Sequence, residues 1–542
     1  GSGNIAMAES TSGTTLGLGT ATGAILSDSE LDNITTSGTL TIGQATTKGS
    51  DGAGTSASTL TSGAITFDEL TLGSKNVALI SNSTINDDDD TSASLTTSGT
   101  LTLTSSGNIG ASGGSQGLDL DVGTLSISGT GSGNVIVTEA STLALGATTV
   151  GGTLSATATT GDITDSGNLA ITGAATFITG VAGSNIVLDS SGNAFSNSVE
   201  MRAGAGGEAF GNITFVDSAG IVFATSAGSN GDLYINSSTD GTVGGNLSVT
   251  ATTGNITDTV AVVTTGSSTS SFTTSATNGT IVLNTPAALS GAVTLSTTGA
   301  SGNATIDNGT TALNIAASTI GGNLTLTSGA AAGITDSGTV TVAGNLVATT
   351  DANNGVIDLG TTTVTGTMDL TSDGSGNVTI DNGTSDIVLI ASEIGGTLTL
   401  TSGAAAGITD TGTVTVAGNL VATTDDNNGV IGLDTTAVTG TVALTTNGSG
   451  NATFDNGTLN LDLAASSVGG NLTVTSGATA GITDSGTVTV AGNLVATTDD
   501  NDGVIDLGQM AVDGTVALTT NGNGAATIVN DAGLSFTTST VG

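Results

Sequence analysis

The sequence from residue 321 to residue 360 reads GGNLTLTSGAAAGITDSGTVTVAGNLVATTDANNGVIDLG, and its repetition determines the architecture. The block returns almost unchanged at 395–434 and at 469–508, so its three copies stand at a constant 74-residue spacing. Looser relatives of the block begin at Gly244 and Gly151. Self-similarity at a fixed period is typical of solenoid proteins, in which each repeat buries its apolar face against its neighbours.

A finer period lies inside each block. Gly-Asn-Leu or related tripeptides begin at Gly322, Gly344 and Gly366, a period of about 22 residues, and the next begins about 30 residues later at Gly396. Runs such as Leu-Thr-Leu-Thr at 324–327 alternate apolar and polar residues, which predicts half-buried β-strands. Gly, Asn and Asp separate these runs and favour turns, because they tolerate positive φ. No stretch gives a convincing helical pattern.

These patterns predict an all-β fold, a parallel β-solenoid with three short strands per coil of about 22–30 residues and a 74-residue higher-order repeat. Inward Leu, Ile and Val would stack into one core that needs few aromatic side chains, and aromatic residues make up 2% of the chain. The predicted segments are degenerate coils over 1–150, a repeat unit over 151–243 with an insertion around 190–240, and repeat units over 244–320, 321–394, 395–468 and 469–542.

The repeated Gly-Asn-Leu runs, each followed by a short run with Gly, Ile and Asp, carry a family resemblance. They stand at 322–328 and 333–336, and again at 344–350 and 355–358. Here the chain resembles the repeat regions of filamentous-haemagglutinin-type exoproteins and related bacterial autotransporters and giant surface adhesins. The resemblance covers most of 151–542. It implies a right-handed β-helix, secretion across an outer membrane, and a role in adhesion, biofilm or cell-surface structure.

The charge balance excludes several classes of function. The chain has 45 Asp and Glu against 3 Lys and Arg, a formal net charge of -42, so we expect no nucleic-acid binding through phosphate-neutralising side chains. It has no His, Cys or Trp, which excludes a Ser-His-Asp triad, a thiol nucleophile and the usual zinc sites. No apolar run approaches the ~18 residues of a membrane-spanning helix, so we expect no transmembrane segment.

An enzyme is a competing hypothesis, because β-helices also host polysaccharide lyases and glycosidases. Such sites need two carboxylates, and usually basic or aromatic side chains that bind sugar and tune pKa values. The side chains available for that work are few and scattered: Lys48, Lys75, Arg202 and Tyr234. Asp336, Asp410 and Asp484 recur at equivalent positions, which is typical of a repeated turn residue. We therefore expect no enzymatic activity and no organic cofactor.

Acidic runs suggest a weak Ca²⁺ site, because Ca²⁺ prefers hard oxygen ligands. The candidate ligands are Asp87, Asp88, Asp89, Asp90, Asp425, Asp426, Asp499, Asp500 and Asp502. The alternative is that these residues form Asx-rich turns and a solvated acidic run. A surface of this charge repels its neighbours, so lateral packing of copies would need cations or high salt.

Outward threonines open a further alternative. Pairs such as Thr325 and Thr327, or Thr399 and Thr401, are similar to the flat Thr arrays of ice-binding solenoids. The competing interpretation is that Thr simply suits a solvent-facing strand. The longer coil expected in each repeat would interrupt any flat array at every third turn.

The sequence as a whole predicts a secreted, extracellular or cell-surface structural protein: a stiff acidic rod that forms a filament, sheath or layer by end-to-end and lateral self-association. Neither end shows a polar capping segment, so we expect a segment of a longer array or a subunit whose open ends stack on the next one. The main alternative is the stalk of a larger adhesin, with an unidentified glycan or host or cell-surface ligand. Its binding segment would be 190–240, which holds Met201, Arg202, Phe210, Phe215, Phe223 and Tyr234, unless this insertion is only a covering loop.

Overall fold

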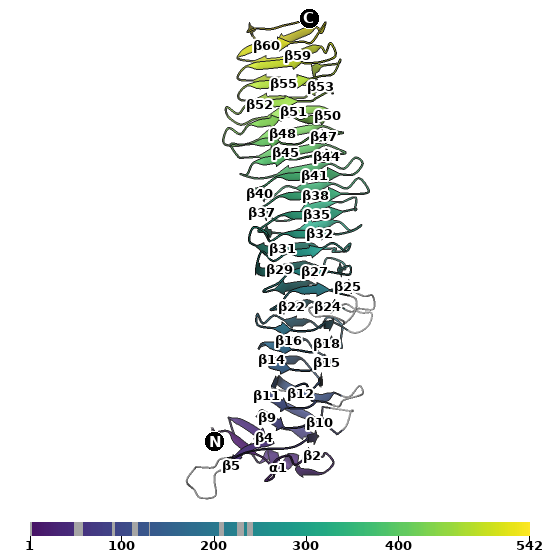
Figure 1. Cartoon of the computed structure of the whole chain (residues 1–542), viewed down its shortest axis with the longest axis vertical. Helices are drawn as coiled ribbons and strands as arrows, with labels where there is room; N and C mark the ends of the chain where they lie inside the picture. The colour runs from purple at the N-terminus through teal and green to yellow at the C-terminus, as the bar shows by residue number, and fades with distance from the viewer. Residues whose placement is uncertain are drawn as a thin grey trace. The chain divides into compact units, whose positions relative to one another are not determined.

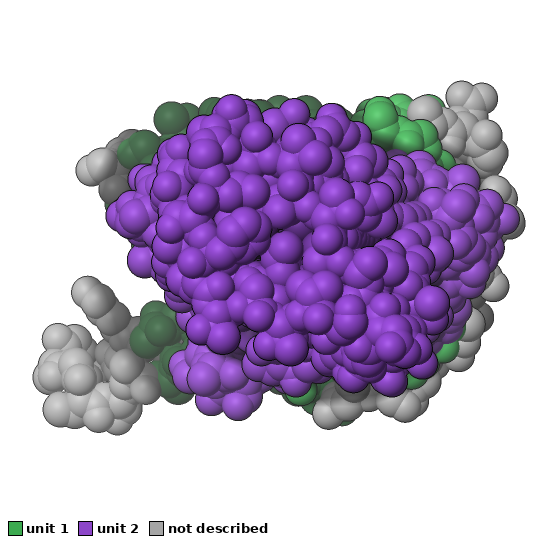
Figure 2. Space-filling model, turned by 90° about the horizontal axis from the view of Figure 1, so that it is seen from above, with its two compact units in different colours: residues 1–276 green, residues 277–542 purple. Residues whose placement is uncertain are grey.

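The computed structural model describes residues 3–47, 58–88, 93–110, 117–128, 131–204, 211–224, 232–235 and 242–542. The chain divides into two compact units, residues 1–276 and residues 277–542, which are coloured separately in Figure 2. Apart from one short helix, the described elements are β-strands, and within each unit they stack as parallel coils (Figure 1). This confirms the predicted all-β parallel solenoid. None of the described helical residues forms a segment long and apolar enough to cross a membrane.

The strands of unit 1 vary in length from two to eleven residues. They are β1 (Ile5–Met7), β2 (Leu16–Gly19), β3 (Ala24–Leu26), β4 (Thr39–Ile42), β5 (Gln44–Thr47), β6 (Ser58–Thr61), β7 (Ile65–Asp68), β8 (Leu70–Thr71), β9 (Asn76–Ser81), β10 (Ile85–Asp87), β11 (Leu95–Ser105), β12 (Leu118–Ser128), β13 (Val135–Glu139), β14 (Leu143–Val150), β15 (Leu154–Ala158), β16 (Ile163–Asp165), β17 (Leu169–Ile171), β18 (Ala175–Thr179), β19 (Ile186–Leu188), β20 (Ala194–Phe195), β21 (Val199–Arg202), β22 (Ile213–Asp217), β23 (Ile221–Phe223), β24 (Asp232–Ile235), β25 (Thr242–Val243), β26 (Leu247–Ala251), β27 (Ile256–Asp258), β28 (Val263–Thr264) and β29 (Ser270–Thr277). The pair β5–β6 is antiparallel, a departure from the parallel coils.

Unit 1 also holds a helix that the sequence pattern did not predict, α1 (Asp28–Asp32). Glu30 Oε2 accepts hydrogen bonds from the backbone N–H of Ser27 (2.9 Å) and from its hydroxyl (2.7 Å). This is the capping box, in which a Ser and a Glu three residues later satisfy free donors at a helix start. Leu31, within this helix, is fully buried. The Ser27 to Glu30 spacing was the available signal, and the surrounding strand periodicity outweighed it.

The strands of unit 2 fall into two columns, and the chain crosses from one column to the other at every half-turn. The first column contains β30 (Ile281–Leu283), β32 (Ala304–Asp307), β35 (Leu324–Ser328), β38 (Leu346–Thr350), β41 (Met368–Ser372), β43 (Ile387–Leu389), β44 (Ser392–Ile394), β46 (Ile408–Asp410), β47 (Val414–Val416), β49 (Ile431–Leu433), β50 (Thr436–Val438), β52 (Ala452–Asp455), β55 (Leu472–Ser476), β58 (Leu494–Thr498), β60 (Thr515–Thr519) and β62 (Ser535–Phe536). The second contains β31 (Ala292–Thr298), β33 (Leu313–Ile315), β34 (Ser318–Ile320), β36 (Ile334–Asp336), β37 (Val340–Val342), β39 (Ile357–Leu359), β40 (Thr362–Val364), β42 (Val378–Asp381), β45 (Leu398–Ser402), β48 (Leu420–Thr424), β51 (Thr441–Thr445), β53 (Leu461–Leu463), β54 (Ser466–Val468), β56 (Ile482–Asp484), β57 (Val488–Val490), β59 (Ile505–Val512) and β61 (Ala526–Asn530).

Strand register shows how the 74-residue repeat fits these columns. Leu324 pairs with Leu346, and Leu346 pairs with Met368, all in the first column. Leu398 follows Leu324 by one repeat, yet it pairs with Val378 in the second column. Between the start of β35 and the start of β45 the chain makes seven half-turns, or three and a half coils. Equivalent residues of successive repeats therefore lie in opposite columns.

Coil length is nearly constant through unit 2. The number of residues along the chain between register partners in neighbouring coils changes little. It is smaller for Val378 and Leu398 and slightly larger for Ile408 and Ile431. A half-turn is either one straight strand, such as β35, or a bent pair of three-residue strands, such as β36 and β37. Where the Gly-Asn-Leu tripeptides are more widely spaced, two straight strands, β41 and β42, follow each other. The wider spacing is thus one and a half coils, and the expected longer coil does not occur there.

The core of unit 2 follows directly from the alternating sequence. In β35 the side chains of Leu324 and Leu326 are fully buried, while Thr325 and Thr327 are only partly buried on the outer face. The same alternation repeats along both columns, so each coil adds a layer of Leu, Ile and Val. Burying such a side chain stabilises the fold by roughly 1.5–3 kcal/mol, which is why a core without large aromatic clusters suffices.

Candidate functional site

Asparagine side chains link consecutive coils at the turn before each straight strand. Oδ1 of Asn303 accepts a hydrogen bond from the backbone N–H of Asn323 (2.8 Å), and Oδ1 of Asn323 accepts one from Asn345 (2.9 Å). Oδ1 of Asn345 accepts the next from Thr367 (3.0 Å). We call this arrangement the asparagine ladder. Further rungs are Asn377–Thr397, Asn419–Thr441, Asn451–Asn471, Asn471–Asn493 and Asn493–Thr515 in unit 2, and Asn76–Thr100, Asn108–Asn134, Asn134–Thr153, Asn185–Asn212, Asn212–Asn246 and Asn246–Thr269 in unit 1.

The glycine before most ladder asparagines, and before Thr367, is explained by the same geometry. A Cβ atom on Gly344 would overlap Asn323 Oδ1 and the backbone of Gly322, and a Cβ on Gly366 would overlap Asn345 Oδ1. The glycines also stack directly, since the N–H of Gly344 donates to the carbonyl of Gly322 (2.9 Å). The recurring Gly-Asn-Leu motif is therefore a coil-stacking device: Gly makes room, Asn supplies the bond and Leu enters the core.

A second device involves an asparagine that is fully buried. Asn382 is 0% exposed, and its Oδ1 accepts a hydrogen bond from the N–H of Val364 (2.7 Å). Its Nδ2 donates to the carbonyls of Val364 (3.0 Å) and Asp386 (2.6 Å). In unit 2, whose residues are all described, β40 pairs with β37 and no strand follows it in the column. The side-chain amide of Asn382 takes the place of the missing peptide group, so the end of β40 stays hydrogen-bonded.

The same use of an asparagine amide recurs once per repeat. Asn308, Asn456 and Asn530 stand at the same 74-residue spacing, and their amides bond the backbone of Leu289, Val438 and Val512 respectively. We call these positions changeovers, because in that column a bent pair of strands in one coil is followed by a straight strand in the next coil. Sequence reasoning missed them, since Asp-Asn-Gly reads as an ordinary turn. The strict recurrence of this tripeptide at 307–309, 381–383 and 455–457 was the available signal.

The recurrent aspartates, predicted as turn residues, are the last residues of short strands, and their side chains join coils. Asp336 accepts hydrogen bonds from the N–H groups of Gly360 (3.0 Å) and Thr361 (2.9 Å), which lie one coil further on. Asp410 makes the equivalent bonds to Asp434 (3.0 Å) and Thr435 (2.9 Å). Since these carboxylates are occupied by backbone donors at equivalent places, they form a repeated clamp between coils.

The structure places five of the candidate metal ligands in two equivalent turns. Asp426 Oδ1 accepts the N–H of Asn427 (2.8 Å), and Asp500 Oδ1 accepts that of Asn501 (2.8 Å), so each carboxylate bonds the backbone of its own turn. Asp502 Oδ1 accepts the N–H of Asn523 in the next coil (2.7 Å). Each turn contains one more candidate ligand, whose carboxylate lies next to a glycine of the preceding coil. Asp425 lies next to Gly403, and Asp499 lies next to Gly477.

These turns are held by the preceding coil as well. Asn427 and Asn428 adopt positive φ (52° and 55°), a conformation that Asn tolerates better than most residues. Asn427 Nδ2 donates to the carbonyl of Gly403 (2.7 Å), and Asn501 Nδ2 donates to Gly477 (2.7 Å). The interpretation of both segments as turns rich in Asp and Asn therefore accounts for their conformation.

The acidic run of unit 1 is partly described. Asp87 Oδ2 accepts the N–H of Asp119 (2.9 Å), and Asp88 Oδ2 accepts the N–H (2.7 Å) and the hydroxyl (2.8 Å) of Thr22. The backbone hydrogen bond from Thr22 lowers the pKa of Asp88. Asp89 and Asp90 lie outside the described residues. Over the described ranges, no three acidic side chains gather closely enough to hold a metal ion, so the Ca²⁺ site stays a prediction.

Comparison with known families supports the repeat character of the chain. A family model described as "Repeats of unknown function (DUF5649)" matches residues 132–202, 301–360 and 449–502. Each matched segment contains coils of the kind described above, and the last two contain a ladder and a changeover asparagine. Searches of curated proteins and of solved structures return no match. The chain is thus similar to a repeat family and forms a β-solenoid, while the haemagglutinin-type resemblance stays an expectation.

The aromatic side chains of the 190–240 segment belong to the core where they are described. Met201, Phe215 and Phe223 are at most 3% exposed. Phe195 packs on Phe215 with ring centroids 5.2 Å apart. Arg202 is paired with Glu200 of the same strand. Phe210 and the side chain of Tyr234 lie outside the described residues. The described aromatics therefore fill the solenoid interior, where a surface ligand would not reach them.

Among the described residues of unit 1, two carboxylates are buried, and sequence reasoning missed both. Glu139 is 0% exposed, and its two carboxylate oxygens each accept the N–H of Val122 (3.2 Å). Burial raises the pKa of Glu139 to about 7, with a smaller contribution from the charge of Asp121. Asp217 is 2% exposed, and burial raises its pKa too. Apolar and polar residues alternate from Val135 to Glu139, and this alternation places Glu139 on the same inward face as Val135 and Val137. That alternation was the available signal in the sequence.

Threonine columns follow the strand register on the outer face of unit 2. Thr327, Thr349 and Thr371 are consecutive register partners in the first column. The equivalent column of the next repeat, which includes Thr401 and Thr423, lies in the second column of strands. Thr columns are therefore present but short, and successive ones lie in opposite columns of strands, because a repeat contains a half-integral number of coils.

Proposed function

We propose that this chain is a non-enzymatic extracellular structural protein, a stiff acidic solenoid rod that builds a cell-surface filament, sheath or layer by end-to-end and lateral association. One observation carries the proposal: side chains that could serve chemistry are used to join coils. The asparagine ladder, the changeover amides and the aspartate clamps all bond the backbone of a neighbouring coil. Such redundancy resists local opening, which is the property that an element under mechanical load needs.

The surface charge supports an assembly that ions control. At a formal net charge of -42, copies of the chain repel one another at low ionic strength. Salt screens this repulsion over a Debye length of about 10 Å at 0.1 M, and divalent cations neutralise carboxylates more strongly. We therefore expect association to increase with salt and with Ca²⁺, although the carboxylates of Asp426, Asp500 and Asp502 already accept backbone hydrogen bonds.

Negative-stain electron microscopy of the isolated chain tests the proposal. The protein would be imaged at low salt, at high salt, and with Ca²⁺ before and after chelation, with sedimentation velocity run in parallel. Filaments or a lattice at high salt or with Ca²⁺ are the expected result. Single particles under every condition would contradict the self-associating role. If the filaments or the lattice disappear on chelation at fixed ionic strength, bridging cations hold the lateral contacts.

Ice binding is a second candidate, favoured by one observation. The threonine columns present hydroxyl and methyl groups at the strand spacing of about 4.8 Å. Each column is short, however, because the next repeat continues it in the opposite column of strands. A measurement of thermal hysteresis and ice recrystallisation distinguishes the two candidates. Activity that Thr349→Lys abolishes would support ice binding, and its absence at high protein concentration would exclude it.

A further inference from the structure

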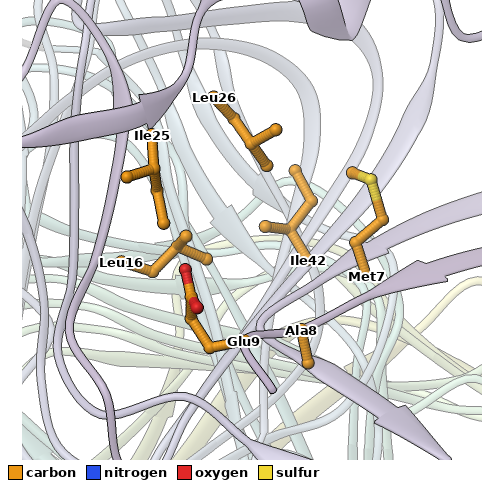
Figure 3. A pocket seen from close by; sticks show the side chains of 7 residues that line it. All are labelled: Met7, Ala8, Glu9, Leu16, Ile25, Leu26 and Ile42. Atoms are coloured by element: carbon orange, nitrogen blue, oxygen red, sulfur yellow. The ribbon is translucent and has the colours of Figure 1, made fainter. Parts of the chain in front are cut away.

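Two hollows of the described residues differ in their chemistry. One, in unit 1, has a volume of about 280 Å³, and the side chains that line it in Figure 3 are apolar except for Glu9. The other is a groove of about 430 Å³ in unit 2. Small apolar residues line it together with two carboxylates, those of Asp307 and Asp351. A ligand in the groove of unit 2 would therefore contact both apolar surface and negative charge.

The groove runs along successive turns of the first column, those that follow β30, β32, β35 and β38. These strands are consecutive register partners, and Figure 1 shows β32, β35 and β38 stacked above one another. Asp307 is the last residue of β32, and Asp351 directly follows β38. At a strand spacing of about 4.8 Å, the backbones of the two aspartates lie two coils, or roughly 10 Å, apart.

Glycines make the middle of the groove hollow. Gly309 and Gly329 line it without a side chain, and the N–H of Gly329 donates to the carbonyl of Gly309 (2.6 Å). A Cβ atom added at Gly329 would lie 2.9 Å from Asp351 Oδ1, and one added at Gly309 would lie 3.2 Å from Pro286 Cβ. Pro286 therefore borders the groove at one end and Asp351 at the other, with bare backbone between them.

Two alanines widen the groove compared with its counterparts in later repeats. The changeover register aligns Ala287 with Thr362, since each lies two residues before the backbone N–H that a changeover amide accepts. The 74-residue spacing aligns Ala352 with Asp426, and the repeat after that again has Thr and Asp at these places. The fold thus accommodates larger side chains at both positions, and this copy has small ones.

The two carboxylates of the groove have capacity left for a cation. Asp307 Oδ1 accepts the N–H of Gly309 (2.9 Å), while within the described chain its other oxygen and the carboxylate of Asp351 accept no hydrogen bond. Unit 2, all of whose residues are described, contains no Lys or Arg, so neither charge is neutralised inside the unit. Of the 3 Lys and Arg in the chain, Lys75 and Arg202 already pair with carboxylates of unit 1. A second copy of the chain is therefore a poor source of the matching cation.

We propose that this groove binds a basic segment of a partner protein, one that carries two Lys or Arg residues three positions apart. In the polyproline II conformation such residues lie on one face, about 9 Å apart, which matches the separation of Asp307 and Asp351. The methylene stem of Lys or Arg can lie along small apolar residues such as Pro286 and Ala287 while its charged head reaches a carboxylate. Arg can in addition bind a carboxylate through two parallel hydrogen bonds. This contact is separate from the self-association proposed above.

A binding measurement with two matched peptides tests the proposal. The probe is a fluorescein-labelled hexapeptide with two arginines separated by two alanines, and the reference peptide has glutamines in place of the arginines. Fluorescence anisotropy is measured at about 0.15 M salt, where a Debye length of about 8 Å limits attraction by distant charges. The unaltered chain should bind the arginine peptide and should not bind the glutamine peptide.

Variants separate the groove from a general attraction to an acidic rod. Ala352→Asp adds a negative charge but fills the groove, so binding should weaken severalfold, whereas general attraction predicts tighter binding. Ala287→Thr fills the groove without changing the charge and should also weaken binding. Asp351→Asn should weaken binding by about fivefold, the upper range for an exposed ion pair. Its matched control is Asp358→Asn, which removes the same charge from an exposed residue of β39 outside the groove and should bind like the unaltered chain.

Circular dichroism verifies that each variant keeps its β-structure, which we expect because later repeats have Asp and Thr at the positions of Ala352 and Ala287. If Ala352→Asp binds the arginine peptide as tightly as the unaltered chain, or more tightly, overall charge holds the peptide and the proposal is overturned. Equal effects of Asp351→Asn and Asp358→Asn, or no binding by the unaltered chain, would overturn it too. None of these outcomes depends on self-association, which sedimentation velocity measures separately.

Discussion

Both units bury asparagine amides, but two carboxylates of unit 1 are more deeply buried than any carboxylate of unit 2. In unit 2 the changeover amides of Asn382 and Asn456 are fully buried and bond backbone groups on both their donor and acceptor sides. In unit 1 the buried groups include the carboxylates of Glu139 and Asp217, whose pKa values burial raises. A neutral amide satisfies its neighbours at any pH, whereas a carboxylate must lose its charge or remain costly. The changeover amides therefore stabilise unit 2 equally at any pH, while the buried carboxylates make unit 1 sensitive to pH.

The largest expected effect comes from removing a changeover amide. Asn382→Leu should lower the free energy of unfolding of unit 2 by about 3 kcal/mol or more, because it leaves both backbone groups of Val364 buried without partners and removes the bond to the carbonyl of Asp386. Urea unfolding followed by circular dichroism gives the total, and hydrogen exchange locates the loss at β40. A loss below about 1 kcal/mol would show that the amide does not replace a strand, since one ordinary hydrogen bond is worth that much.

The second effect separates the units by pH. Because the folded pKa of Glu139, about 7, lies above its ordinary value of 4.5, this group's contribution to stability is fully present below pH 4.5 and is lost as pH rises through 7. The difference amounts to on the order of 3 kcal/mol between pH 4 and pH 8. Glu139→Gln should remove that part of the pH dependence and stabilise unit 1 at pH 8.

The matched control for the pH prediction is Glu393→Gln, at an exposed glutamate of unit 2. Thermal unfolding of the three proteins at pH 5 and pH 8 provides the comparison. An identical pH dependence in the unaltered chain and in Glu139→Gln would mean that water or a local rearrangement already relieves the buried charge.

The third effect probes the stacking of coils at a glycine. Gly344→Ala should destabilise unit 2 by about 1–3 kcal/mol, because its Cβ would overlap the Asn323 side chain and the Gly322 backbone. Gly360→Ala is the matched control, since a Cβ there meets nothing within 4 Å. It should be neutral or slightly stabilising, because alanine restricts the unfolded chain. Equal effects of the two changes in urea unfolding would contradict the close-stacking explanation of the Gly-Asn-Leu motif.

The smallest effect tests what the units share. Asn345→Ala in unit 2 and Asn134→Ala in unit 1 each remove one ladder bond of similar length, to Thr367 (3.0 Å) and Thr153 (2.9 Å). Both bonds are exposed to solvent, so each loss should cost about 0.5–1.5 kcal/mol. Hydrogen exchange at the two turns should rise by similar factors. A clear effect in one unit alone would mean that the ladder stabilises only regular coils.

Local patterns in the sequence were sufficient for the strands but not for their arrangement in columns. Alternation of Leu and Thr around Leu324 predicts a half-buried strand wherever it occurs, because side chains on a strand point to opposite faces. It does not reveal that Leu398 pairs in the opposite column, since that depends on how many half-turns intervene. Asn382 shows a related limit. A residue type that favours turns is expected to be exposed, yet its amide is buried because a strand ends there and its backbone groups need partners.

The half-integral number of coils per repeat gives the array a parity. If one 74-residue block were lost from the middle of unit 2, every residue beyond the deletion would move to the opposite side relative to the residues before it. Loss of two blocks would restore the original side and only shorten the stack. Gain or loss of an even number of repeats during replication of the gene would thus preserve a surface contact that uses one side of the stack. Gain or loss of an odd number would disrupt it.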